Sequence, residues 1–454
     1  MRSTEPAHPQ RRARLIQALA GLLTTMAGRL AIAQSSQPPA SDPAPKKNAS
    51  SPANRPASPA ASAGNPSATT PAANAAPPQV VSNRPLPSSL EWKEGDSLIV
   101  HNDYAIETRR EVLGRQVITP TRSLFVRDNA APPPARILEE RGQWAVSFSG
   151  VAEPDAYTLA ELQAMPSRTV ATVLQCPENG RGLQCPENGR GLQAVPAPGT
   201  PWQTGGAGCV IWTGVPLTTV VHELGGIAPE SRYLTATGGD VLPDGIPSDF
   251  TRVERSVPVS AMEHALLAWK LNGEPIPLAH GGPLRLVLPG YASINYIKYV
   301  KRIAFTKDES SAHIQTADFR VPLRPGQPNL TIPAWRLPVK SWITSPTAAD
   351  TTTVKAGPVQ IEGVAMGGSS AVTRIEVSAD GGRNWEVAQL TGPDFGPFAW
   401  RLFTATLTLP AGPAVLVCRA SNAAGQQQPE RTRDNTGYFV NGWHEHRVVL
   451  TVNA

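Results

Sequence analysis

Proline occurs throughout this chain, at 47 of its 454 residues. Because proline lacks an amide hydrogen and its ring collides with the preceding helical turn, this frequency excludes a long-helix bundle or a coiled coil. Charged residues make up only 17% of the chain, and 38 glycines supply further turns. At about 150 residues per domain, the length predicts two or three domains. We therefore expect sheet-rich domains with many loops.

The first 33 residues have the pattern of an export signal. Arg2, Arg11, Arg12 and Arg14 precede an apolar run at 15–26, and Ala31–Ala33 offers a cleavage site. About 12 apolar residues are too few to cross a bilayer, so we expect no membrane span in the mature chain. The pair Arg11-Arg12 leaves a twin-arginine signal and an ordinary secretory signal equally open.

Residues 34–90 form a predicted linker. Between Pro38 and Pro87 lie 13 prolines among Ala, Ser and Asn, with few large apolar residues. Such a stretch cannot offset its ordering entropy, so we expect an extended segment that acts as a spacer. We expect the folded part to begin near Leu90.

The folded part has two patterns. Residues 91–336 mix an alternating strand at 144–148 with a short helix that follows Thr158. A β-branched strand at 170–174 runs into Cys176, and together these signals predict an α+β domain. In residues 337–454, short strands recur about every 8–12 residues, with turns such as Asp380–Gly382. This second pattern predicts an immunoglobulin-like β-sandwich.

The nine-residue segment LQCPENGRG is present twice in tandem, at 174–182 and at 183–191. Nine residues are too few for a solenoid repeat, so this is a local duplication. It provides two equivalent cysteines, Cys176 and Cys185, each followed five residues later by an arginine, Arg181 or Arg190. An adjacent arginine favours the thiolate, the form that ligates metals. The alternative is a buried structural cysteine, which is the commoner role for a lone cysteine.

Several function classes lack their sequence signals here. The net charge is +5 and no block of five or six like charges occurs, so nucleic acid is not an expected partner. Four cysteines are too few for a disulfide scaffold, and no Cys-x-x-Cys-His motif attaches a haem. No phosphate-binding loop, nucleophile elbow or dinucleotide fingerprint is present. His444 and His446 could hold a metal from one strand face, but such pairs are usually exposed polar residues.

Five motifs lie in order along the folded part. They are Leu124–Asn129; Leu174-Gln175-Cys176 with its Asn and Arg; Trp202–Leu217; Asn272–Lys298; and Val377–Gly382 with Trp443-His444. In this order they resemble the sulfite oxidase family of molybdopterin enzymes, specifically the molybdenum subunit of exported bacterial sulfite dehydrogenases. The resemblance covers roughly residues 115–450.

The resemblance implies a chemistry and a set of site residues. It implies molybdenum with molybdopterin, held by a cysteine thiolate, and oxidation of sulfite or a related sulfur oxyanion to sulfate. The positions that match the anion-binding residues are Arg127 and either Arg181 or Arg190. The positions that match the residues for the pterin and its phosphate are Asn129, His280, Arg285 and Lys298. Phe319 matches a position beside the substrate. It also implies a periplasmic location, a cytochrome c acceptor, and a homodimer or a heterodimer with a haem subunit.

Cys176 is the preferred molybdenum ligand because it ends a strand, whereas a loop absorbs nine extra residues at little entropic cost. Cys185 remains the rival because its spacing to Trp202 resembles that of relatives. We expect Cys209 and Cys418 to be small core residues, and Trp202 to be core as well.

Three substrate-side positions depart from the family pattern. Asp128 and Asn129 replace an Asn-His pair, and Phe319 replaces a tyrosine, which removes a hydroxyl near the substrate. Asp128 would repel an anion unless Arg127 pairs with it. Together with the duplicated loop, these changes keep a second hypothesis open. In it, the chain is a catalytically weakened or silent member that serves as a binding or scaffold subunit of a sulfur-oxidising complex.

Overall fold

The structure is a computed structural model that describes residues 84–184, 199–324, 327–347, 354–433 and 436–454. The predicted signal segment, most of the predicted linker, Cys185 and Arg190 lie outside the described residues. All described residues belong to one compact unit, residues 69–454. Residues 84–90, which we assigned to the linker, already pack: the 3-10 turn η1 (Ser88–Leu90) buries Leu90.

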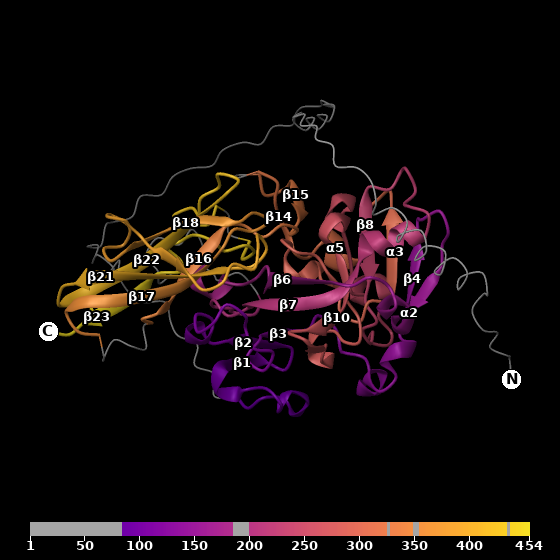
Figure 1. The fold of residues 1–454 in the computed structure, drawn as a ribbon, viewed down its shortest axis with the longest axis horizontal. Helices are drawn as coiled ribbons and strands as arrows, with labels where there is room; N and C mark the ends of the chain where they lie inside the picture. The colour runs from indigo at the N-terminus through magenta and orange to yellow at the C-terminus, as the bar shows by residue number, and fades with distance from the viewer. Residues whose placement is uncertain (1–83, 185–198, 325–326, 348–353, 434–435) are drawn as a thin grey trace, which may run out of the picture. The chain divides into compact units, whose positions relative to one another are not determined.

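The α+β domain contains two five-stranded sheets and one three-stranded sheet. The small sheet has the order β1 (Leu98–Asn102), β2 (Ala105–Thr108), β3 (Val126–Arg127). One large sheet has the order β11 (Glu274–Pro275), β10 (Leu266–Leu271), β7 (Ala207–Pro216), β6 (Arg168–Gln175), and β12 (Arg285–Val287) also pairs with β10. The long strands β6 and β7 run side by side in Figure 1, antiparallel from Arg168↔Gly214 to Gln175↔Ala207.

The second large sheet carries most of the remaining strands of this domain. Its order is β5 (Ala156–Thr158), β4 (Ala145–Ser149), β13 (Arg302–Thr306), β8 (Tyr233–Thr237), β9 (Glu254–Pro258). A separate hairpin joins β14 (Arg320–Pro322) and β15 (Thr331–Pro333). The helices are short: α2 (Leu159–Gln163), α3 (Leu217–Glu223), α4 (Ser248–Thr251) and α5 (His313–Thr316). Within the described ranges, no helix has the length and hydropathy needed to cross a membrane.

The local sequence signals of this domain are confirmed. The alternating run at 144–148 forms β4, and the β-branched run at 170–174 forms β6, which ends one residue before Cys176. Thr158 caps α2 through a reciprocal capping box with Glu161, which satisfies two of the amides left unpaired at the first turn. The fold class α+β is therefore correct.

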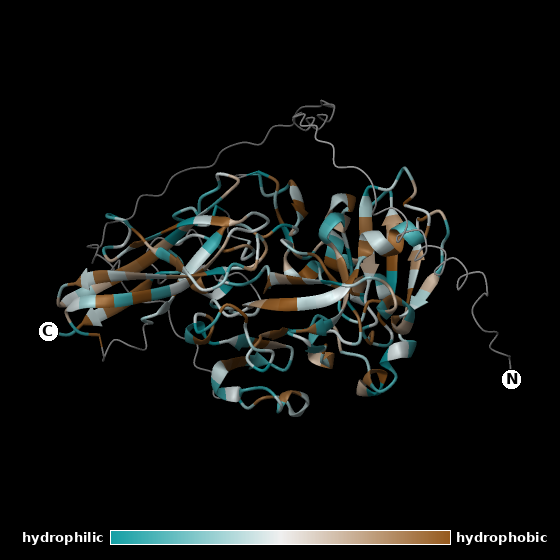
Figure 2. Ribbon diagram, in the orientation of Figure 1, coloured by the Kyte–Doolittle hydropathy of each residue, from teal (hydrophilic) through white to brown (hydrophobic). Residues whose placement is uncertain are grey.

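The C-terminal domain is the predicted immunoglobulin-like β-sandwich. One sheet has the order β16 (Lys340–Ser345), β17 (Gly357–Met366), β21 (Arg401–Leu409), β20 (Gln389–Thr391). The other has the order β19 (Glu386–Val387), β18 (Val372–Ser378), β22 (Gly412–Asn422), β23 (Val448–Val452). Figure 2 shows hydropathy alternating along these strands, as expected for strands with one buried face. At the predicted turn, Asp380 Oδ1 accepts the amide hydrogens of Arg383 and Asn384.

Side chains from both domains share one apolar cluster. Val117, Cys209 and Phe319 of the α+β domain belong to it together with Trp342 and Trp400 of the sandwich. Trp400 is fully buried, and its indole Nε1 donates to the carbonyl of Val117 at 2.7 Å. The sandwich is therefore bound to the α+β domain by burial and by a directed hydrogen bond, and not only by the chain between them.

We expect Trp400→Phe to lower the free energy of unfolding by about 1–3 kcal/mol, because the carbonyl of Val117 is left buried without a donor. Urea denaturation followed by circular dichroism measures the change. Trp385→Phe serves as the control; Trp385 is a half-buried tryptophan on the sandwich whose ring meets Trp443 edge to face, with centroids 5.2 Å apart. A Trp400→Phe variant as stable as the wild type would contradict the role assigned to this contact.

Candidate functional site

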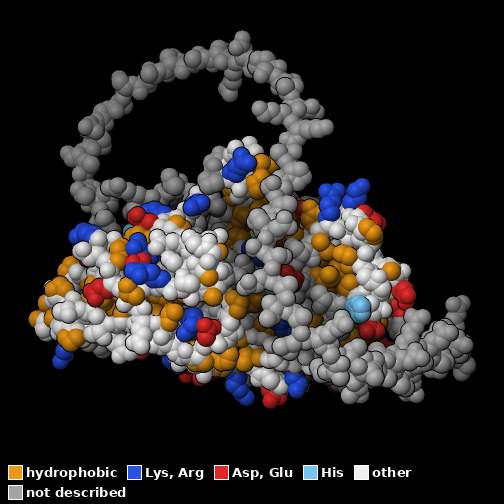
Figure 3. Space-filling model, turned by 45° about the horizontal axis from the view of Figure 1, so that its top comes forward, with side chains coloured by type: hydrophobic (Ala, Val, Ile, Leu, Met, Phe, Trp, Pro, Cys, Tyr) orange, Lys and Arg blue, Asp and Glu red, His pale blue; other side chains and the backbone are white. Residues whose placement is uncertain are grey.

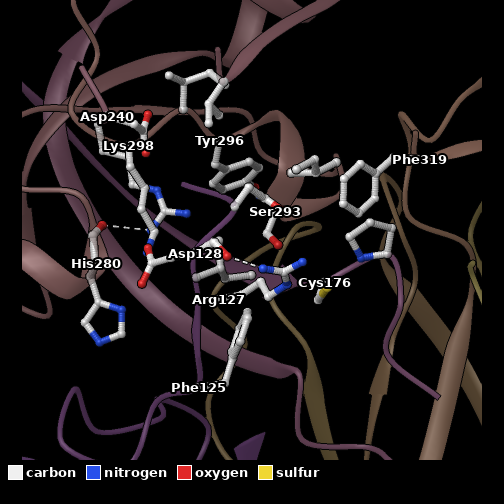
Figure 4. Close-up of a pocket in the computed structure, with 17 residues that line it drawn as sticks. Phe125, Arg127, Asp128, Cys176, Asp240, His280, Ser293, Tyr296, Lys298 and Phe319 are labelled. Carbon is white, nitrogen blue, oxygen red and sulfur yellow. Dashed lines mark hydrogen bonds and ion pairs between the residues drawn. The ribbon is translucent and has the colours of Figure 1, made fainter. Parts of the chain in front are cut away.

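One pocket collects seven of the ten residues singled out from the sequence. Arg127, Asn129, Cys176, His280, Arg285, Lys298 and Phe319 all line a cavity of about 50 Å³, which we call the inner pocket. They come from the end of β3, the loop after β6, the segment between β11 and β13, and the loop between α5 and β14. Figure 4 shows Cys176, Arg127 and Phe319 toward one side of this pocket, with Lys298, Asp240 and His280 toward the other.

Cys176 begins a loop, residues 176–181, which we call the Cys loop. The thiol is buried at 2% exposure, and the backbone amide donates to the carbonyl of Gly206 at 2.8 Å. Burial raises the pKa of the Cys176 thiol to about 12; the carboxylate of Glu178 also raises it, and Arg127 and Arg181 oppose the rise. A bound metal cation would replace the proton and stabilise the thiolate. The chemistry of this buried sulfur thus fits a metal ligand.

The side chain of Asn179 fixes the shape of the Cys loop. Its Oδ1 accepts the amide hydrogen of Gly206 at 3.0 Å, and its Nδ2 donates to Gln175 Oε1 at 3.2 Å. Its backbone carbonyl accepts from the buried Lys340 Nζ of β16 at 3.1 Å. The loop is therefore held from β6, from the segment before β7, and from the sandwich.

Arg127 and Asp128 lie next to each other at the pocket wall. Arg127 donates to the backbone carbonyl of Asp128, its Nε lies 3.9 Å from Glu178 Oε2, and that Nε has no hydrogen-bond partner among the described residues. The carboxylate of Asp128 instead pairs with Lys298 Nζ at 2.5 Å. The cation that pairs with the Asp128 carboxylate, and so offsets its repulsion of an anion, is therefore Lys298 and not Arg127.

His280 and Arg285 are buried polar groups with unused donors or acceptors. His280 ends the 3-10 turn η9 (Leu278–His280), and its carbonyl accepts from Arg285 Nη1 at 2.8 Å. His280 Nε2 and Arg285 Nε have no hydrogen-bond partner within the described part of the chain. Burial lowers the pKa of His280 well below its usual value, and Lys93, Lys298 and Arg285 lower it further.

These orphaned atoms test whether the pocket suits a pterin phosphate. Buried polar groups in folded proteins almost always have partners, and a buried guanidinium binds phosphate strongly. Burial lowers the pKa of Arg285 only to about 10, so its guanidinium keeps its charge at neutral pH. An anionic group placed here would supply the missing partner. The residues present fit the cofactor.

A second cavity, the outer cavity, shares Arg127, Asp128, Asn129 and Phe319 with the inner pocket and has a volume of about 800 Å³. Its wall adds Glu178, Arg252, Asp318 and Tyr438, none of which the sequence reasoning identified. On the face seen in Figure 3, acidic and basic side chains are interspersed, with no broad patch of one sign.

Arg181 does not line the inner pocket. It begins the 3-10 turn η6 (Arg181–Gln184), is 4% exposed, and pairs with Glu178 Oε1 at 2.9 Å. Its guanidinium also lies over the ring of Tyr438, with its Cζ 5.1 Å from the ring centroid. Phe319 lines both cavities at a positive φ of 49°. The roles assigned to these residues stay predictions.

Trp202, Cys209 and Cys418 are buried core residues, as expected. The interpretation of His444 and His446 as exposed strand residues is wrong. Both precede β23, and His446 is buried with its Nδ1 2.8 Å from the carbonyl of Gly442. Over the ranges that the structure describes, no group of three or more His, Cys, Asp or Glu is arranged to hold a metal ion.

Two family models match the two domains. The oxidoreductase molybdopterin binding domain matches residues 131–314, and the Mo-co oxidoreductase dimerisation domain matches residues 332–452. Sulfite oxidase of Gallus gallus is 30% identical over 363 residues, which are 74% of this chain and 74% of the relative. The chain belongs to the sulfite oxidase family. Its cofactor is accordingly molybdenum with molybdopterin.

Other relatives agree with this assignment. Mitochondrial sulfite oxidase of Homo sapiens is 31% identical over 362 residues, 75% of this chain. The match spans 63% of the length of that relative. The solved structure of the sulfane dehydrogenase SoxCD from Paracoccus pantotrophus is 26% identical, with a TM-score of 0.63 over 77% of this chain and 87% of that chain.

We expect Cys176→Ser to abolish molybdenum binding, because a serine hydroxyl is a poor substitute for a soft thiolate ligand. The matched variant Cys185→Ser should retain the metal. Elemental analysis of protein purified from a host that makes the cofactor measures the molybdenum content of each variant. The reverse pattern, with molybdenum lost only from Cys185→Ser, would transfer the ligand role to the second copy.

Proposed function

We propose that this chain oxidises sulfite, or a related sulfur oxyanion, to sulfate at the inner pocket. The observation that carries the proposal is the placement of Arg127 in the same pocket wall as the Cys176 thiol, with an Nε that has no hydrogen-bond partner among the described residues. The reaction adds one oxygen atom from water to sulfite and releases two protons and two electrons. When bound, the molybdenum-pterin group supplies oxygen-atom transfer and accepts the electron pair.

Two ends of the pocket would have different tasks. Cys176 holds the metal at one end, and Arg127 binds the oxyanion there through charge-assisted hydrogen bonds. His280 and Lys298, which Figure 4 shows at the other end, would hold the pterin and its phosphate together with Arg285, whose Nη1 donates to the carbonyl of His280. Asn129, which lines both cavities, lies beside Asp128 and Arg127 on the same wall.

The sequence and the family also support a proposal for the electron acceptor, the assembly and the location. The electrons would leave singly to a cytochrome c, since the chain has no haem-attachment motif of its own. The sandwich matches a dimerisation domain, which supports a homodimer or a heterodimer with a haem subunit. The arginine-led apolar segment at the N-terminus supports export to the periplasm.

We expect Arg127→Gln to lower kcat/KM for sulfite by roughly 10–100-fold, because a hydrogen bond to a charged group is lost. Sulfite-dependent reduction of ferricyanide by molybdenum-loaded protein measures the effect. Arg136→Gln removes an exposed arginine outside both cavities and should match the wild type. Equal values for Arg127→Gln and the wild type would refute the assignment of Arg127 to substrate binding.

One observation favours the second candidate, a weakened or silent family member. The buried carboxylate of Glu178 pairs with Arg181 at 2.9 Å and lies 3.9 Å from Arg127 Nε. An acidic group placed between two cations competes with an anionic substrate for both of them. Phe319 beside it has no hydroxyl to offer. Loaded wild-type protein that reduces neither ferricyanide nor cytochrome c on addition of sulfite would support this candidate over the oxidase.

We expect Glu178→Gln to lower KM for sulfite by about tenfold, because the competing negative charge is removed while an amide oxygen remains for Arg181. Steady-state assays with ferricyanide measure KM at constant ionic strength. Glu139→Gln, at an exposed position away from both cavities, controls for the change in net charge. An unchanged KM would mean that Glu178 serves only the structure of the loop.

A further inference from the structure

A loop of the sandwich, residues 436–440, is attached to the Cys loop. The amide of Phe439 donates to the carbonyl of Pro177 at 2.7 Å, and Arg181 Nε donates to the carbonyl of Gly437 at 3.4 Å. Gly180 packs so closely on Val440 that an added Cβ would lie 2.8 Å from the Val440 Cβ. The loop therefore takes its position from the same segment that carries the thiol.

Tyr438 is the residue of this loop that lines the outer cavity. Its ring lies beside Phe319, with ring centroids 5.5 Å apart and an interplanar angle of 44°. The Arg181 guanidinium lies over the Tyr438 ring at 5.1 Å. The ring is thus fixed between an aromatic side chain and a cation, so its hydroxyl has a defined location in the cavity wall.

The O–H group of Tyr438 is available to donate a hydrogen bond. Its oxygen accepts the amide hydrogen of Phe319 at 3.3 Å and also accepts a hydrogen bond from the side chain of Arg181. A phenol has one O–H donor, and no described residue is seen to accept it. Burial raises the pKa of the Tyr438 phenol above its ordinary value, so the group stays protonated at neutral pH. The neighbouring Phe319, which lines both cavities, offers no hydroxyl.

We propose that Tyr438 is a substrate-binding residue, whose phenolic hydroxyl donates a hydrogen bond to an oxygen of the sulfur oxyanion as it lies between the two cavities. The inference rests on the proposed function of the site and adds a residue from the sandwich to it. A neutral donor is suited to this position because Glu178, at the same wall, already occupies the guanidinium of Arg181. The hydroxyl adds a hydrogen bond to the oxyanion without adding a charge to the cavity wall.

The first test replaces the hydroxyl while keeping the ring. In molybdenum-loaded full-length protein, we expect Tyr438→Phe to lower kcat/KM for sulfite by roughly 10–100-fold, since one hydrogen bond to a charged group is lost. The molybdenum content should be unchanged. Tyr157→Phe, on the edge strand β5 with its ring edge to face with Phe148, is the matched control and should behave as the wild type. A Tyr438→Phe variant with wild-type kcat/KM would overturn the inference.

A second measurement separates substrate binding from a structural role. Moving the hydroxyl to the adjacent ring in the double variant Phe319→Tyr with Tyr438→Phe should recover at least several-fold of the lost kcat/KM. The inhibition constant of sulfate, the product, should rise in Tyr438→Phe and fall again in the double variant. The inference would be overturned if Tyr438→Phe lost activity with an unchanged inhibition constant for sulfate and the double variant recovered none of that activity. Tyr438 would then have a structural role alone.

The wild-type protein distinguishes this inference from the proposed function. Loaded wild type that neither oxidises sulfite nor binds it in calorimetry would overturn both. Loaded wild type that oxidises sulfite as fast as Tyr438→Phe does would overturn only the role of Tyr438. Oxidation by the wild type, with loss and recovery in the two variants, would support both.

Discussion

The hydrogen bonds of Asn179 are the constraint on which the site depends. Its side chain joins Gln175, at the end of β6, to Gly206, just before β7, and its carbonyl is bound by Lys340 of the sandwich. Cys176 therefore presents its sulfur from a position that the α+β sheet and the C-terminal domain determine together. Preorganisation of this kind reduces the entropy that binding a ligand costs.

Without a ligand, the inner pocket lowers the free energy of unfolding, because it buries polar atoms that lack hydrogen bonds. Arg127, His280 and Arg285 are buried or partly buried and keep atoms without partners in the described structure. Their desolvation is a cost that an anionic ligand would offset. A group that binds only the folded state also stabilises it by mass action. Cofactor insertion and the final stability of this domain are therefore thermodynamically linked.

The sequence predicted the parts of this protein that have local signals. Alternation and a capping hydroxyl located β4 and α2, and motifs in a recognisable order identified the residues of the inner pocket. Long-range electrostatic pairing had no such signal: Asp128 pairs with Lys298 across 170 positions. Tyr438 lies in a loop of the other domain, outside any strand period, and its approach to Phe319 depends on how the sandwich packs.

The loop at 436–440 belongs to the sandwich but contributes to the wall of the outer cavity. The residues that surround the thiol and the orphaned cations come from the α+β domain, whereas part of the outer cavity wall comes from the sandwich. A change of the Tyr438 side chain, which lines only the outer cavity, can therefore alter that wall without replacing any residue of the inner pocket. Evolution could thus change which sulfur compound binds through substitutions at 436–440, a segment far along the chain from the residues that would hold the cofactor.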